Sequence, residues 1–155
     1  MLTTSTALTL AKHNHWADQV LFHAIQTTLF DTLLGTLNHN HQVDLIWRAH
    51  LLSTPHGFTH RRGLLCPNFP DLIHHQMELN QWYIDWAGQQ DEKSLSVKGK
   101  FTYVNGTQAE MARGEMFLHV VTHKMYHRGW VAQMFFGFGV CPPEMDFGVF
   151  LGERV

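Results

Sequence analysis

The sequence predicts an all-α protein, a four-helix bundle with a short β-hairpin before the last helix. Two observations support this fold class. Apolar residues recur with helical period in four long segments, and a shorter stretch that ends near Asn105-Gly106 changes to a strand-like period. The chain has 155 residues, of which 45% are hydrophobic and 15% charged, so we expect one globular domain over residues 1–155.

The first helix is expected over about residues 3–28, with a break around residues 30–34. One face of this helix carries Leu10, Asn14, Asp18, Leu21, Ile25 and Leu29. Asn14 and Asp18 interrupt an otherwise apolar stripe. They either support a metal site, line a wet cleft or lie in a partly exposed part of the stripe.

The second helix is expected over about residues 35–52. Its apolar face is defined by Val43, Ile46, Trp47 and His50. His39 lies at the centre of this face and is expected to point inward, whereas His41 points the opposite way and is expected to be solvated. His50 also points inward. It lies roughly 16 Å from His39 along the helix, too far to share an ion with it. We interpret His50 as a satisfied core or helix-end histidine.

Residues 53–70 form a long irregular connection with three prolines and two glycines. Such a segment is often functional or lid-like. Its two arginines and two histidines either meet an anionic substrate or belong to an ordinary solvated loop. The third helix is expected over about residues 71–89, and His75 shares its apolar side, which predicts a core histidine.

The last third of the chain contains the predicted hairpin and the fourth helix. Residues 94–111 are expected to form a two-stranded ribbon, with Asn105-Gly106 as a type I′ turn. The fourth helix is expected over about residues 112–136, and Gly137-Phe138-Gly139 ends it. An extended tail should follow from Cys141 to Val155, with its apolar residues covering the bundle or a partner subunit.

The fourth helix carries the strongest chemical pattern, because His119, His123 and His127 follow one another at intervals of four residues. Neighbours at this spacing lie about 5–6 Å apart and can hold one metal ion. His119 and His127 are separated by roughly 12 Å and cannot share an ion. The pair is therefore 119/123 or 123/127, and a third ligand must come from another helix. The same side of the helix carries Ala112, Met116, Val120, Trp130, Val131 and Met134, so the imidazoles are expected to face the core.

Two interpretations of these histidines remain open on spacing alone. They are either metal ligands or core histidines bonded to carbonyls or carboxylates. Bundles commonly build metal sites from facing helices, and His39 can face His123 and His127. Three imidazoles leave at least one coordination position open, which is the catalytic pattern, and they suit zinc, nickel, copper or iron.

Composition excludes several classes of function. The net charge of −2 argues against a nucleic-acid-binding protein. No secretory signal and no apolar run of about 20 residues is present, so we expect no membrane association. Two cysteines give no disulfide framework, and a reduced, cytoplasmic setting is expected.

Four motifs of the chain occur together in an order that resembles one known family. They are NHWAD at residues 14–18, GTLNH at 35–39 followed by Asp44 and Trp47, the histidine series closing on Arg128-Gly129, and PPEMD at 142–146. In this order and spacing they are similar to the DinB-like (damage-inducible, YfiT-like) metalloenzymes. Asp18, Thr122, Tyr126 and Trp130 depart from the family pattern, so substrate specificity does not transfer with the resemblance.

The resemblance implies a four-helix bundle, often a homodimer, in which His39, His123 and His127 hold a divalent ion. Relatives include mycothiol-dependent maleylpyruvate isomerases and bacillithiol transferases, in which the metal binds the cofactor thiolate; others are suspected hydrolases. We therefore expect a metal-dependent thiol S-transferase or hydrolase that acts on a small molecule. Zinc or nickel is the expected metal, and a low-molecular-weight thiol is a candidate cofactor.

The resemblance implies that His119 either lines the pocket or supports the metal ligands without binding the ion itself. Asn14, Asp18 and His119 are the candidate base or orienting groups. Which of His119, His15 and His75 reaches the pocket stays open. The alternative function is a non-catalytic metal- or ligand-binding stress-response protein.

Overall fold

The computed structural model describes residues 2–28 and 31–153, and they form the predicted helical bundle with its hairpin. The long helices are α1 (Thr4–Thr28), α2 (Asp31–Leu51), α3 (Phe69–Gly88) and α5 (Arg113–Gly137). Two short helices are α4 (Glu92–Ser96) and α6 (Phe147–Gly152). Strands β1 (Lys98–Thr102) and β2 (Gln108–Ala112) pair antiparallel before α5, with Lys98 opposite Ala112 and Thr102 opposite Gln108.

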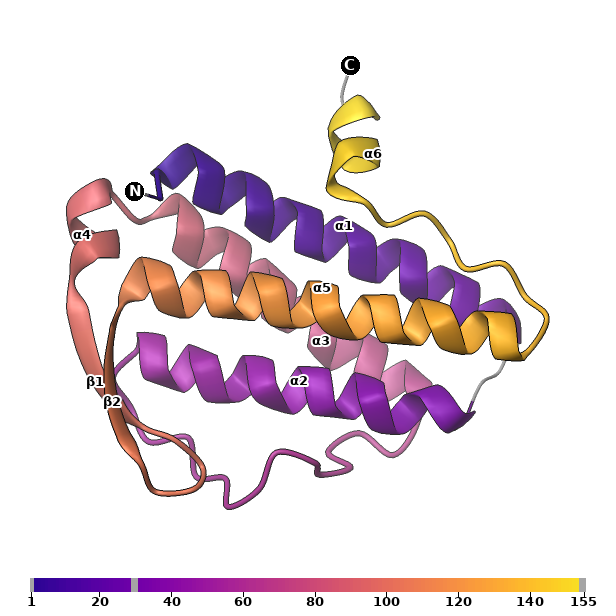
Figure 1. Cartoon of the computed structure of the whole chain (residues 1–155), viewed down its shortest axis with the longest axis horizontal. Helices are drawn as coiled ribbons and strands as arrows, with labels where there is room; N and C mark the ends of the chain where they lie inside the picture. The colour runs from indigo at the N-terminus through magenta and orange to yellow at the C-terminus, as the bar shows by residue number, and fades with distance from the viewer. Residues whose placement is uncertain (1, 29–30, 154–155) are drawn as a thin grey trace.

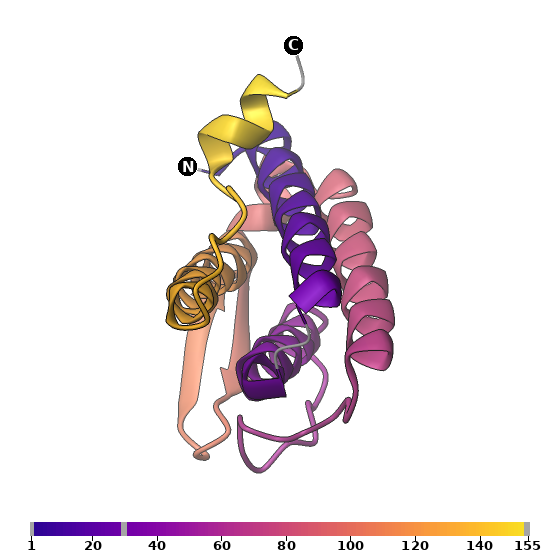
Figure 2. The same ribbon diagram turned by 90° about the vertical axis from the view of Figure 1, so that its right-hand side faces the viewer.

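The long helices run in two directions (Figure 1). α1 and α5 run one way, and α2 and α3 run the other way. α1 packs against α3 and α2 packs against α5, which the end-on view also shows (Figure 2). Because the consecutive helices α2 and α3 are parallel, the chain between them must return along the length of the bundle. Residues 52–68 make this return, and we call them the crossover.

Two predicted boundaries were wrong. α2 begins at Asp31, so the break expected over residues 30–34 is already helical there; Leu29 and Phe30 lie outside the described residues. The tail is also not extended throughout, because residues 147–152 form α6. This helix lies on α1, where the ring of His13 is 5.2 Å from Phe147 and 5.5 Å from Phe150. Phe147 and Phe150 of the tail therefore pack on the bundle, as one of the two expectations had it, whereas Leu151 is 41% exposed.

The predicted hairpin is present, but residues 94–96 of the predicted ribbon belong to α4, and the turn is not type I′. That turn requires positive φ at both central residues. Among the described non-glycine residues only Ser53 has positive φ, whereas Gly106 has φ +85°. Gly106 N–H donates to the carbonyl of Tyr103, and Tyr103 N–H donates to that of Thr107. The loop is therefore a three-residue connection with glycine in the left-handed position, a geometry that Gly adopts without steric cost.

The core consists of two apolar clusters with a polar layer between them. The cluster near the hairpin includes Trp47, Tyr83, Trp86, Phe101 and Phe117, and the other includes Leu21, Ile25, Leu72, Val131 and Phe135. On each long helix, buried polar residues separate the two sets. Within residues 2–28 and 31–153, no helix combines the length and the apolar composition that crossing a membrane requires.

Candidate metal centre

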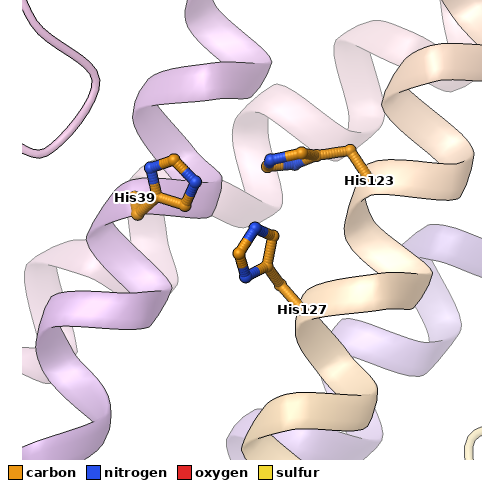
Figure 3. A group of neighbouring side chains, drawn as sticks. All are labelled: His39, His123 and His127. Carbon is orange, nitrogen blue, oxygen red and sulfur yellow. The ribbon is translucent and has the colours of Figure 1, made fainter.

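Three of the predicted site residues lie together between α2 and α5 (Figure 3). His39 projects from α2, and His123 and His127 project from successive turns of α5. The ring centroids are 5.3 Å apart for His39 and His123, 4.8 Å for His39 and His127, and 4.5 Å for His123 and His127. One nitrogen from each ring lies within 4.8 Å of the others. The geometry is that of a possible three-histidine metal site, and metal binding itself stays a prediction.

The tautomer of His39 follows from its hydrogen bond to the crossover. Its Nδ1 lies 2.5 Å from the carbonyl oxygen of Arg61. A carbonyl only accepts, so Nδ1 is the donor, and the tautomer of the neutral ring that makes this bond has its lone pair on Nε2. Metal-binding histidines are commonly fixed by this kind of bond from the other ring nitrogen. His39 is therefore held in the form that a metal ligand needs.

His123 and His127 are kept neutral by their surroundings. Burial, with help from the neighbouring His127 and His39, lowers the pKa of His123 to about 3. Burial also lowers the pKa of His127, and His39 and Arg62 add to this effect. The Nδ1 atoms of both rings are buried, with no hydrogen-bond partner among the described residues. Two neutral imidazoles, together with His39 oriented by its bond to Arg61, form a donor set that fits a divalent ion such as zinc or nickel.

His119 lies beside this cluster and outside it. Its ring packs on Trp47 with centroids 4.1 Å apart and lies 5.7 Å from the ring of His123. Burial lowers its pKa, against the opposing charge of Asp44. His119 and His127 are eight residues apart on α5, so the helix holds His119 away from His127, as predicted.

Two cavities border the cluster from different sides. The first, of about 330 Å³, is lined by His39 and His127 together with Arg62 and Trp130. The second, of about 340 Å³, is lined by His123 and His119 with residues that include Trp47, Tyr103, His60 and Arg61. Small molecules thus have room to reach the histidines from either side.

The crossover is fixed to α2 by side-chain amides. Asn38 accepts from Cys66 N–H at 2.8 Å and donates to Cys66 C=O at 2.9 Å. Gln42 accepts from Gly63 N–H and donates to His60 C=O, both at 2.7 Å. Each amide thus satisfies a backbone donor and a backbone acceptor, as a neighbouring strand would. The segment next to the histidines is therefore held in one conformation.

Asn14 and Asp18 lie elsewhere, in the polar layer at the centre of the bundle. Asp18 Oδ2 is 2.7 Å from Lys124 Nζ, and its Oδ1 is 3.3 Å from Arg128 Nη1. Arg128 also donates to Asn14 Oδ1 at 2.8 Å, and Lys124 contacts Asp44 at 2.8 Å. Lys124 is 2% exposed and Arg128 3%. Neither Asn14 nor Asp18 lines the two cavities beside the histidines.

The two cations decide the ionisation of Asp18. Burial favours the neutral acid, but Lys124 and Arg128 outweigh it and lower the pKa of Asp18. Asp44 has Lys124 as its cation, and burial prevails there, so its pKa is raised. The pKa of Lys124 is raised because Asp18 and Asp44 together overcome its burial.

Sequence reasoning missed Lys124 and Arg128. The wheel of α5 was centred on the histidines, yet Trp130, which it placed inward, is 53% exposed. Met116, Val120 and Val131 are buried as predicted, but the core side of α5 also carries Phe117, Val121, Lys124, Arg128 and Phe135. Two carboxyl-bearing positions, Asp18 and Asp44, face it. Asp18 could have indicated these cations, because a carboxylate on the apolar stripe of α1 requires a cation on a neighbouring helix.

Two further histidine predictions were wrong. His41, expected to be solvated, is 5% exposed, and its Nδ1 lies 2.9 Å from Gln76 Oε1. It belongs to the polar layer, because Gln76 in turn donates to Asp44 and Asn80. His75, expected in the core, is exposed and lies 3.7 Å from Glu78.

The remaining inward histidines lie outside the three-histidine cluster, although His50 lines the second cavity with His119 and His123. His50 is buried as predicted and packs on Phe101 with centroids 4.4 Å apart. Its Nε2 has no hydrogen-bond partner in the described part of the chain, so it is not the satisfied histidine that was expected. His15 is half-buried on α1 and lines neither cavity.

Comparison with known proteins gives one match. The family model of the DinB family matches residues 1–154. No curated protein and no solved structure matches the chain.

Proposed function

The chain belongs to the DinB family, and from this premise we propose that it is a metal-dependent enzyme, a thiol S-transferase or a hydrolase. The observation that carries the proposal is the convergence of His39, His123 and His127 between two cavities. Three imidazoles would hold zinc or nickel with a coordination position open. The bound ion would act as a Lewis acid that lowers the pKa of a thiol or of water.

The proposed function gives specific roles to the residues around the three histidines. His39 is oriented by the carbonyl of Arg61, which keeps its lone pair toward the other two rings. His119 lines the second cavity beside His123 and is the best placed of the candidate bases. Trp47 packs against it and fixes the plane of its ring. Asn14 and Asp18 are better placed to position α5 than to touch a substrate, because they contact its buried cations.

Cavities of 330–340 Å³ suit small-molecule substrates, with a low-molecular-weight thiol as one candidate. We also propose a homodimer. Its support is the exposed apolar surface of α5 and the residues that follow, namely Leu118, Met125, Tyr126, Phe136 and Phe138. Exposed apolar surface of this kind often marks an interface.

The proposal is tested by the metal content of the purified, untagged protein, measured by plasma mass spectrometry. We expect about one equivalent of metal in the wild type, lost in His39→Ala and in His123→Ala because each removes one of three ligands. His23→Ala, which removes an exposed histidine of α1, is the matched control and should retain the metal. Circular dichroism checks that the variants are folded. A wild type that cannot be loaded, or ligand variants with full metal, would overturn the site.

Activity separates an enzyme from the alternative, a non-catalytic metal- or ligand-binding stress-response protein. The loaded protein is screened for transfer of low-molecular-weight thiols to electrophiles and for hydrolysis. We expect His119→Ala to lower turnover while the metal content stays at the wild-type level. Metal binding without turnover in either screen would favour the binding protein.

A further inference from the structure

Among the described residues that line the cavity beside His39 and His127, Arg62 is the single charged side chain other than histidine. None of these lining residues is an aspartate or a glutamate. In the described part of the chain, Arg62 makes no ion pair, and its side chain is exposed. The guanidinium is therefore available to an anion that enters the cavity.

The backbone on both sides of Arg62 is held to α2. The carbonyl of Arg61 accepts from His39 Nδ1, and the N–H of Gly63 donates to Gln42 Oε1 at 2.7 Å. A loop residue between two such anchors keeps its place in the wall, so little ordering is needed when a ligand binds. The same hydrogen bond that orients His39 thus helps to place Arg62.

The rest of the cavity wall fits a compact ligand with a flat apolar part. Thr32 and Thr36 bring hydroxyl groups to the wall from α2. Between them lies Gly35, whose missing side chain leaves open space, since a Cβ there would meet no atom within 4 Å. Trp130 supplies an indole that is 53% exposed and adjoins His127, with ring centroids 6.4 Å apart.

We propose that Arg62 is the specificity-determining residue of this site and selects a small molecule with an anionic oxygen group and a planar apolar body that packs on Trp130. The inference rests on the proposed function, because it names the substrate class of the same site. Arg61 is the rival residue, since it lines the second cavity beside His123. A test must therefore distinguish two adjacent arginines.

The experiment is calorimetric titration of the full chain with benzoate, phenyl phosphate and the neutral analogue benzamide. We expect Arg62→Gln to weaken binding of the anionic probes about fivefold to tenfold and to leave benzamide binding unchanged. Trp130→Ala should weaken all three probes, and Arg61→Gln should leave their affinities at the wild-type level. The stronger of the two anionic probes identifies the preferred group, carboxylate or phosphate.

Three results would overturn the assignment: wild-type affinity for both anions in Arg62→Gln, an equal loss in Arg61→Gln, or no binding of either anion to the wild type. Each titration is run on metal-free and on zinc-loaded protein, because a carboxylate can also bind zinc directly. Loss of anion binding in metal-free Arg62→Gln supports the inference even if the wild type proves unable to hold metal. A loaded site with unchanged anion binding in Arg62→Gln removes this inference and leaves the proposed function standing.

Discussion

Two carboxylates and two cations share the interior of the bundle almost without contact with solvent. Asp18 and Asp44 are 4% and 0% exposed, and Lys124 Nζ lies within 2.8 Å of an oxygen from each. The attraction between such groups offsets the cost of removing them from water only while every partner is present. Each residue of the set is therefore much more sensitive to substitution than a surface ion pair.

Asp18→Asn is expected to lower the free energy of unfolding by about 3–5 kcal/mol, because it leaves Lys124 and Arg128 with one buried carboxylate between them. Urea denaturation at pH 7 measures this change. Asp85→Asn is the matched control, because Asp85 is exposed and accepts a hydrogen bond from Gln81 on the surface of α3. The control should cost no more than about 0.5 kcal/mol. Equal losses in the two variants would show that the buried pairs contribute little.

His50 is expected to make stability depend on pH. Burial lowers its pKa from 6.5 to about 4, with further lowering from His56 and His119. Between these two pH values the unfolded chain binds a proton that the folded chain does not, so stability is present at neutral pH and is lost as the pH falls. Between pH 7 and about pH 4, the free energy of unfolding of His50→Gln should fall by on the order of 2 kcal/mol less than that of the wild type.

The measurement for His50 is urea denaturation of wild type and His50→Gln at a series of pH values. The difference between the two unfolding free energies should narrow or change sign toward acid. Parallel curves over the whole range would mean that His50 titrates in the folded protein as it does in the unfolded chain.

At the scale of elements, α2 both contributes to the candidate site and holds the crossover in place. It carries one histidine of the candidate metal centre, His39, and the two side-chain amides that hold the crossover. Asn38 and Gln42 are 1% and 0% exposed, so water cannot replace the hydrogen bonds that they make. The conformation of residues 60–66 thus depends on two side chains of a neighbouring helix.

Asn38→Ala should cost about 2–3 kcal/mol and should release the crossover around Cys66, because two buried backbone groups lose their partner. Gln42→Ala should act in the same way around Gly63. Native-state hydrogen exchange distinguishes the two. The Cys66 amide should lose most protection in the first variant and the Gly63 amide in the second. Unchanged protection at both amides in both variants would contradict the role assigned to these side chains.

At the scale of the whole molecule, the fold class and the central part of the candidate site could be predicted because both depend on local spacing. Helical periodicity located the four long helices, and intervals of four residues placed His123 and His127 on one side of α5. The wheel of α2 then selected His39 over His41 as the partner from another helix. The structure brings these three side chains together.

The remaining features depend on contacts that a single helix does not encode. A helical wheel assumes one apolar side, whereas α5 contacts both α1 and α2. Lys124 and Arg128 therefore look like surface residues until the carboxylates of those helices are placed opposite them. His41 was misjudged for the same reason, because its partner Gln76 belongs to α3. The crossover has no periodicity, so its attachment to α2 could not be predicted from its own sequence.

The order in which the ribosome releases these helices gives the polar layer a further consequence. Asp18 and Asp44 belong to α1 and α2, which leave the ribosome early, whereas both cations that face them belong to α5. A nascent chain that ends before α5 would have to bury two carboxylates without a counter-charge, which is strongly unfavourable. The first three long helices are therefore expected to stay loosely associated until α5 is complete. Because α5 also carries His123 and His127, closure of the core and assembly of the histidine cluster become one step of biosynthesis.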